Sequence, residues 1–265
     1  MYPASKTMDY PYFFLLLLGI LILFIKSDNF AQSTKFYHLT IEDGLSQNTV
    51  QDIWQDKHGF MWFCTQDGLN RYDGFNFEIF RKKRGDLNSI SDNFITCIHE
   101  DKNGDLWIGT NSGGLNYYNL ENCTFSHFLH DSADPFSISN NNIIGIEDFG
   151  PDQLLIATGN GSIFIFNTET HTFTNFITQI NHQSNLRNNF IHCLEITKDG
   201  RIFLGTDGNG LAEVKIVSES EAEFVYHFNN FTDSQIIMSI LEIEPGLLLI
   251  GTDRKSTRLN SSHYS

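Results

Sequence analysis

Seven polar residues follow a recurring threonine and carry groups that could bind a ligand. Their amide, hydroxyl and carboxylate groups can exchange hydrogen bonds with polar groups of a ligand. The same residue types also form ordinary turns, so the pattern has a structural interpretation beside the functional one. The candidates are Gln66, Asp67, Asn111, Ser112, Asn160, Asp207 and Asn209.

A metal site and a catalytic site are both weakly supported by the residue pattern. The segment 101–105, Asp-Lys-Asn-Gly-Asp, is similar to part of a calcium loop, but the bidentate glutamate that such a loop needs is missing at the required spacing. No CxxC or Cys/His spacing indicates zinc, and the four cysteines are expected to be small structural residues. We therefore expect no metal, no cofactor and no catalytic residue in this chain.

The threonines that precede the polar candidates mark an internal repeat. Each ends a nearly continuous apolar run, and they are 45, 48, 48 and 46 residues apart. A period of about 40 to 50 residues indicates a repeat architecture, in which one unit cannot bury its apolar face alone. The five threonines are Thr65, Thr110, Thr158, Thr206 and Thr252.

Each unit contains four short apolar or aromatic runs separated by turn residues. Positions 15 and 12 before the threonine are apolar in all five units, from Val50 and Ile53 to Ile237 and Ile240. Asp-Gly, Asn-Gly and Pro-Gly groups follow, which are typical of hairpins. Trp62 and Trp107 share the register of Leu155 and are predicted to be core residues, whereas Trp54 is expected to pack with partial exposure.

Four hairpin-linked strands per unit and no helical period predict an all-β protein, a β-propeller. A solenoid of this period would be mostly helical. The partial propeller is expected to span residues 32–253, with four complete blades and half of a fifth. Residues 36–39 look like a strand that closes such a ring against its last blade. The blades are predicted at 45–80, 87–128, 135–176, 185–228 and, incomplete, 233–253.

Both ends of the chain differ from the repeat. Residues 13–25 form an apolar run of 13 residues, which suits a signal peptide better than a membrane helix of about 20 residues. We expect residues 1–31 to be a signal peptide, with an uncleaved anchor as the alternative. Residues 254–265 break the repeat, are basic, and resemble a non-native tail. The net charge of −15 argues against a nucleic-acid partner.

The repeat resembles the two-component regulator propeller repeat. The phrases that carry the resemblance are Leu106–Thr110, Gly-Leu-Asn at 114–116, Ile-His-Glu-Asp at 98–101, the linker 87–93 and the opening 39–46. The third unit departs from the pattern, with Ser-Ile-Phe at 162–164 in place of Gly-Leu-Asn. The resemblance covers about residues 33–253.

The resemblance implies the N-terminal periplasmic sensor region of a hybrid two-component histidine kinase. In that family two seven-bladed propellers and a β-sandwich precede a membrane helix and a kinase. The implied ligand is an oligosaccharide, and the implied role is control of genes for polysaccharide use. The implied partners are the remaining blades and the β-sandwich of the same chain. The resemblance is also compatible with a homodimer of the full-length sensor, which would be tethered to the inner membrane.

Two other functions remain open on the sequence alone. An exported propeller enzyme, a glycosidase or a polysaccharide lyase, is one. A sialidase-like site would need an arginine cluster, and the predicted propeller offers Arg71, Arg81, Arg84, Arg187 and Arg201, two of them in one linker. A scaffold propeller for protein partners is the other.

Overall fold

The structure is a computed structural model that describes residues 36–177, 190–207, 210–218, 221–227, 236–253 and 256–260. The chain divides into two units, Met1–His38 and Leu39–Ser265. The predicted signal peptide, residues 1–31, lies outside the described residues. Residues 36–39 form no strand, contrary to the prediction, because no described segment pairs with them and a strand needs a hydrogen-bonded neighbour.

The second unit is built almost entirely from strands. One 3₁₀ helix, η1 (Ile41–Asp43), precedes them, and no other helix occurs in the described residues. The first sheet contains β1 (Val50–Gln55), β2 (Met61–Thr65), β3 (Gly68–Tyr72) and β4 (Phe77–Phe80); the second, β5 (Ile95–Glu100), β6 (Leu106–Thr110), β7 (Leu115–Asn119) and β8 (Thr124–Phe128). The third contains β9 (Ile143–Gly150), β10 (Gln153–Thr158), β11 (Ile163–Asn167) and β12 (Thr172–Ile177); the fourth, β13 (Ile191–Ile196), β14 (Ile202–Thr206), β15 (Leu211–Ser218) and β16 (Glu221–His227).

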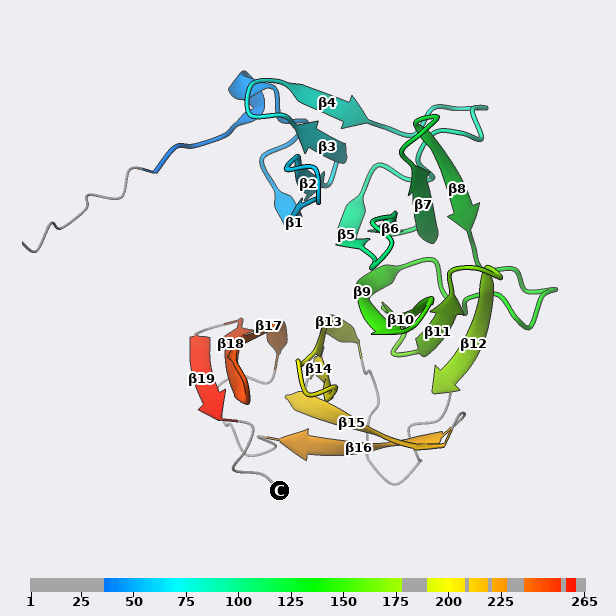
Figure 1. Cartoon of the computed structure of the whole chain (residues 1–265), viewed down its shortest axis with the longest axis vertical. Coiled ribbons are helices and arrows are strands. Elements are labelled where there is room, and N and C mark those ends of the chain that lie inside the picture. Colours follow the sequence, from blue (N-terminus) through cyan, green and yellow to red (C-terminus); the bar gives the residue numbers. More distant parts are fainter. Residues whose placement is uncertain are drawn as a thin grey trace, which may run out of the picture. The chain divides into compact units, whose positions relative to one another are not determined.

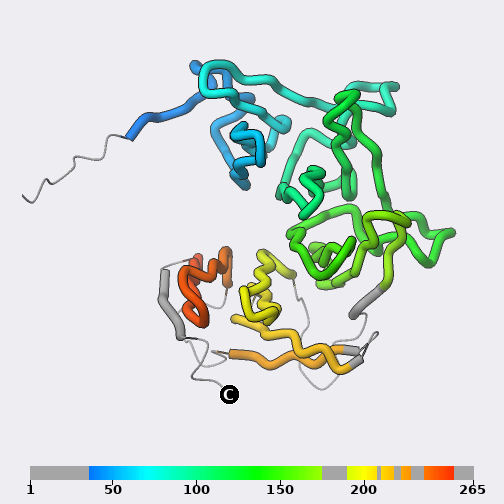
Figure 2. The backbone as a smooth tube through the Cα atoms, in the orientation of Figure 1, coloured from blue at the N-terminus to red at the C-terminus, as the bar shows by residue number. Residues whose placement is uncertain are grey.

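The sheets are antiparallel meanders that follow one another in chain order. Each pairs its strands in sequence order, and the first strand of one sheet contacts the first strand of the next, from β1 through β5, β9 and β13 to β17. This arrangement, with the first strands innermost, is visible in Figure 1 and in the backbone trace of Figure 2. The prediction of an all-β, open and partial propeller is confirmed.

The fifth sheet differs from its prediction by one strand. It contains β17 (Ile237–Glu244), β18 (Leu247–Thr252) and β19 (Ser256–Asn260), whereas only two strands were predicted. β19 comes from the segment 254–265, which breaks the repeat in sequence. It pairs with the free edge of β18 because ladder hydrogen bonds join backbone groups and tolerate most side chains.

Buried apolar clusters lie between consecutive sheets. One joins Trp62 of the first sheet to Ile98 and Leu106 of the second, and the next joins Trp107 to Phe166 of the third. Trp62 and Trp107 are at most 1% exposed, so their predicted place in the core is confirmed. Trp54 packs half-buried against the first cluster, as predicted.

One repeat position that is apolar in every unit is exposed in the first sheet. Ile53 leaves 52% of its surface in solvent, whereas Ile98, at the same repeat position of the next sheet, is 3% exposed. The physical reason is that Ile98 packs back on the first sheet, while no described sheet precedes β1 to cover Ile53. The cysteines are free thiols, with Cys64 and Cys97 buried, Cys193 half-buried and Cys123 exposed.

Candidate ligand-binding site

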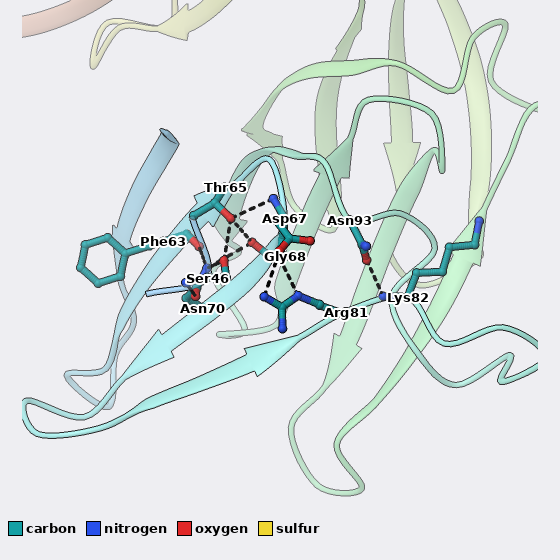
Figure 3. Close-up of polar contacts among 9 residues, drawn as sticks. All are labelled: Ser46, Phe63, Thr65, Asp67, Gly68, Asn70, Arg81, Lys82 and Asn93. Atoms are coloured by element: carbon teal, nitrogen blue, oxygen red, sulfur yellow. Dashed lines mark hydrogen bonds and ion pairs between the residues drawn. The ribbon is translucent and has the colours of Figure 1, made fainter. Parts of the chain in front are cut away.

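The recurring threonine closes the turn between the second and third strands. Thr65 Oγ1 donates to the carbonyl of Gly68 at 2.8 Å and accepts from the backbone N–H of Asp67 at 3.1 Å (Figure 3). Thr110 and Thr206 donate in the same way to Gly114 and Gly210, at 2.9 and 2.8 Å. The polar candidates therefore sit on a turn that the threonine hydroxyl holds in shape.

A buried asparagine of the third strand attaches each of the first two sheets to the segment that precedes its first strand. Asn70 Oδ1 accepts the backbone N–H of Ser46 at 2.9 Å, and Asn70 Nδ2 donates to Ser46 Oγ and to the carbonyl of Phe63 (Figure 3). Asn116 repeats the bond with the N–H of Ser91 at 3.0 Å. In the sequence, Asn116 was noted only as the last residue of the Gly-Leu-Asn phrase. The recurrence of asparagine after Leu69 and Leu115 was the available signal.

The first turn brings its two candidates to the surface in different ways. Asp67 forms an ion pair with Arg81, with Oδ2 and Nη2 3.0 Å apart, and its carbonyl accepts from Arg81 Nε (Figure 3). Gln66 is exposed. Asp67 is thus occupied by a structural contact, while Gln66 faces solvent.

Three candidates on later turns also make structural contacts. Ser112 donates from N and Oγ to Asp92 Oδ2, at 2.9 and 2.6 Å, and Asn160 Nδ2 donates to Ser139 Oγ at 3.1 Å. Asp207 forms an isolated bridge with Ile236 and places Oδ2 3.9 Å from His192 Nε2.

Asn111 is placed differently from these three. Its backbone N–H donates to the carbonyl of Phe94, its exposed side chain makes no hydrogen bond within the described residues, and it lines a cavity. The last candidate, Asn209, lies outside the described residues.

The cavity that Asn111 lines runs along the first strands of the five sheets. Its volume is about 660 Å³, and residues of β1, β5, β9, β13 and β17 line it. Trp54 and His99 stand on its wall with ring centroids 5.4 Å apart. The prediction from sequence was ligand contact at the turns. Nothing in the repeat pattern indicates that the first strands together line a cavity, because their contact depends on how the sheets pack.

Carboxyl groups on the cavity wall are shifted towards their neutral form. Burial, together with the nearby charges of Glu195, Asp148 and Asp52, raises the pKa of Glu147 to about 8. Burial likewise raises the pKa of Glu195, against a lowering effect of the Glu242 backbone N–H, which donates to it at 2.9 Å. A protonated carboxyl can donate as well as accept, which suits a ligand with hydroxyl groups.

Asp52 and His99 tie neighbouring sheets together at the same wall. Asp52 Oδ2 accepts the N–H of Ile98 at 3.0 Å, and burial raises its pKa against the lowering effect of that bond. His99 Nε2 lies 3.4 Å from Asp148 Oδ1; burial lowers its pKa, while Asp148 acts in the opposite direction. In the part of the chain that the structure describes, no three His, Cys, Asp or Glu side chains are grouped to hold a metal.

The comparisons agree with the resemblance inferred from sequence. A model of the family described as two component regulator propeller matches residues 89–112 and 185–208. These two segments are similar to that family's repeat. Histidine kinase P4 of Formosa agariphila is 43% identical over 79 residues, which is 30% of this chain and 6% of that protein. The predicted resemblance is confirmed.

Solved structures show the same repeat fold. The extracellular domain of a hybrid two-component system from B. thetaiotaomicron matches with a TM-score of 0.73 and 26% identity, over 86% of this chain and 31% of that chain. A second extracellular domain of a hybrid system from that organism matches with a TM-score of 0.66 and 24% identity, over 86% and 32% of the two chains, and shows the fold alone. The chain thus spans about a third of these structures. No helix in the described residues has the length and apolar character to cross a membrane.

Proposed function

We propose that this propeller is part of an exported, periplasmic sensor region and that it binds an oligosaccharide where Asn111 lines the cavity of the first strands. The observation that carries the proposal is an exposed amide at the edge of a cavity of about 660 Å³. That volume lies within the range of about 300–1,000 Å³ usual for small-ligand sites. The similarity to extracellular domains of two-component systems supports the exported location.

The proposed mechanism is a shift between two arrangements of the full-length sensor. An oligosaccharide that binds one arrangement more tightly changes their ratio by the difference in its affinities. The first strands are suited to transmit such a change, since Asp52 and Glu195 each accept a backbone N–H from the next sheet. A membrane-tethered kinase and control of polysaccharide-utilisation genes complete the proposal.

The chain itself is proposed to be non-catalytic. A sialidase-like site needs convergent arginines, whereas three arginines of the described residues form ion pairs at separate places. Arg71 pairs with Glu78 in the first sheet, Arg81 with Asp67 at the turn, and Arg201 with Glu213 in the fourth sheet. Incubation with polysaccharide and analysis of the products should show no cleavage.

The binding proposal is tested with Asn111→Ala and a matched control. Asn103→Ala changes another exposed asparagine of the second sheet, at the turn on the opposite end of its strands. Calorimetric titration with oligosaccharides of dextran, xylan and laminarin should show binding of at least one, about tenfold weaker in Asn111→Ala and unchanged in the control. Equal affinities in all three proteins would overturn the site, and no binding of any saccharide class would overturn the function.

A further inference from the structure

A basic run stands out in this acidic chain. Four consecutive cations, 81–84, lie in the linker between the first and second sheets, while the chain as a whole has a net charge of −15. Arg81 pairs with Asp67, but Lys82, Lys83 and Arg84 are exposed and form no ion pair within the described residues. In Figure 3 the Lys82 ammonium extends away from the contacts that surround Arg81.

These three cations line a cavity of about 450 Å³. The wall also contains the apolar side chains of Leu87 and Leu129, which are exposed, and polar groups of the linker and of β8. The surface therefore combines positive charge, hydrogen-bonding groups and apolar area in one concave site.

The linker is held in shape without the cations. Ser89 Oγ accepts the N–H of Lys83 at 2.9 Å and donates to the carbonyl of Asp86 at 2.8 Å. Asn93 Oδ1 accepts the N–H of Lys82 at 2.8 Å, and His127 Nε2 donates to the carbonyl of Ser89 at 2.7 Å. All four bonds use backbone groups of the linker, so they fix its path whatever the side chains of 82–84 are.

The next linker is an internal control, because it repeats the same bonds. Ser137 Oγ accepts the N–H of Asp131 at 2.9 Å and donates to the carbonyl of Asp134 at 2.8 Å, and Asn141 Oδ1 accepts the N–H of His130 at 2.7 Å. The residues at the positions of the three cations are His130, Asp131 and Ser132. The fold of the linker thus does not require positive charge.

We propose that the cavity beside Lys82, Lys83 and Arg84 binds the anionic groups of a charged saccharide, either sulfate esters or carboxylates. Ammonium and guanidinium groups form charge-assisted hydrogen bonds with such oxyanions, and the exposed leucines offer apolar area for a sugar ring. The inference rests on the proposed sensor function and adds a second site, for an acidic saccharide, to the site at Asn111. Because the charges are exposed, binding weakens as salt rises.

The test uses the full chain and two variants that lose the same charge. The first carries Lys82→Gln, Lys83→Gln and Arg84→Gln; the control carries Lys102→Gln, Lys198→Gln and Lys215→Gln, three exposed lysines elsewhere. The probes are oligosaccharides of dextran sulfate, of galacturonate and of unsulfated dextran. The first variant should bind a sulfated or carboxylated probe at least about tenfold more weakly, and the control should bind as the natural chain does.

A third variant adds charge at the second linker. His130→Lys, Asp131→Lys and Ser132→Arg should strengthen binding of the anionic probe, because that linker has the same backbone path. Circular dichroism and thermal unfolding establish that every variant is folded.

The probes separate failure of this inference from failure of the proposed function. Sulfate and carboxylate arms show which oxyanion the site takes. The inference would be overturned if the first variant and the control lost the same affinity for the anionic probe, or if a single-stranded oligonucleotide competed with that probe as well as the unlabelled saccharide does. Either result would show that binding depends on net charge alone. If neither anionic probe bound to the natural chain while neutral oligosaccharides bound in a way that depends on Asn111, the inference would be overturned and the proposed function would stand.

Discussion

Trp107 and Asp101 are joined across the first hairpin of the second sheet by a hydrogen bond from indole Nε1 to carboxylate Oδ2 at 2.9 Å. The first sheet repeats this bond between Trp62 and Asp56 at 2.7 Å. The other oxygen of Asp101 accepts the N–H groups of Asn103 and Asp105, which fold the turn. The acidic segment that is similar to a calcium loop therefore links a hairpin turn to a core tryptophan.

Removing this tryptophan should destabilise the propeller strongly. Trp107→Ala is expected to cost about 3–5 kcal/mol in the free energy of unfolding, because it empties a large buried site between two sheets. Urea unfolding measures this cost. Saccharide titration at a temperature at which the variant remains folded measures binding separately. Asn111→Ala, on the adjacent exposed turn, should change stability by less than about 0.5 kcal/mol. Unchanged stability with lost binding in Trp107→Ala would show that the tryptophan is a sugar platform.

The buried Asn116 of β7 should hold in place the linker that precedes β5. Asn116→Ala leaves the N–H of Ser91, which is itself buried, without its acceptor, and is expected to cost about 1–3 kcal/mol. Hydrogen exchange should show faster exchange at the Ser91 amide, and unfolding gives the cost. The exposed Asn122→Ala serves as the control. Equal exchange at Ser91 in both proteins would contradict the role of Asn116.

The same substitution at two equivalent repeat positions should have different costs. Ile98→Ala is expected to cost about 2–5 kcal/mol, because Ile98 fills the cluster between the first and second sheets. Ile53→Ala should cost less than about 1 kcal/mol, because half of its surface is already in solvent. Denaturant unfolding of the two variants provides the comparison. Similar costs would mean that another segment covers the outer face of the first sheet.

The free energy of unfolding should decrease as pH rises, because of Glu147. Burial raises the pKa of this carboxyl from its ordinary 4.5 to about 8, so the folded state retains a proton that the unfolded state has released. Its favourable contribution is therefore complete below about pH 4.5 and is lost as pH rises to about 8. Unfolding measured from pH 5 to 9 should show this decline in the natural chain and a smaller one in Glu147→Gln. The exposed Glu121→Gln should keep the natural slope, and a flat natural profile would contradict the prediction.

The repeat and the type of its elements follow from the amino-acid sequence alone. The recurrence of an apolar run before each threonine, with turn residues on both sides, is enough to place four strands in a unit, because alternation and turn chemistry act over a few residues. Trp107 was assigned to the core in this way, from its shared register with Leu155. The turn that carries Gln66 and Asp67 was located in the same way, because turn formation is local.

The contacts that those residues make depend on how the sheets pack in three dimensions. Asn116 meets Ser91 25 positions away, and Asp52 meets Ile98 46 positions away, so neither bond is visible in local pattern. The burial that shifts the pKa of Glu147 arises where first strands of different sheets converge, and Ile53 is exposed only because no described sheet packs on it. The repeated residues specify the same strand in every unit. The burial of a side chain and the charges around it depend on the sheets that pack against its unit.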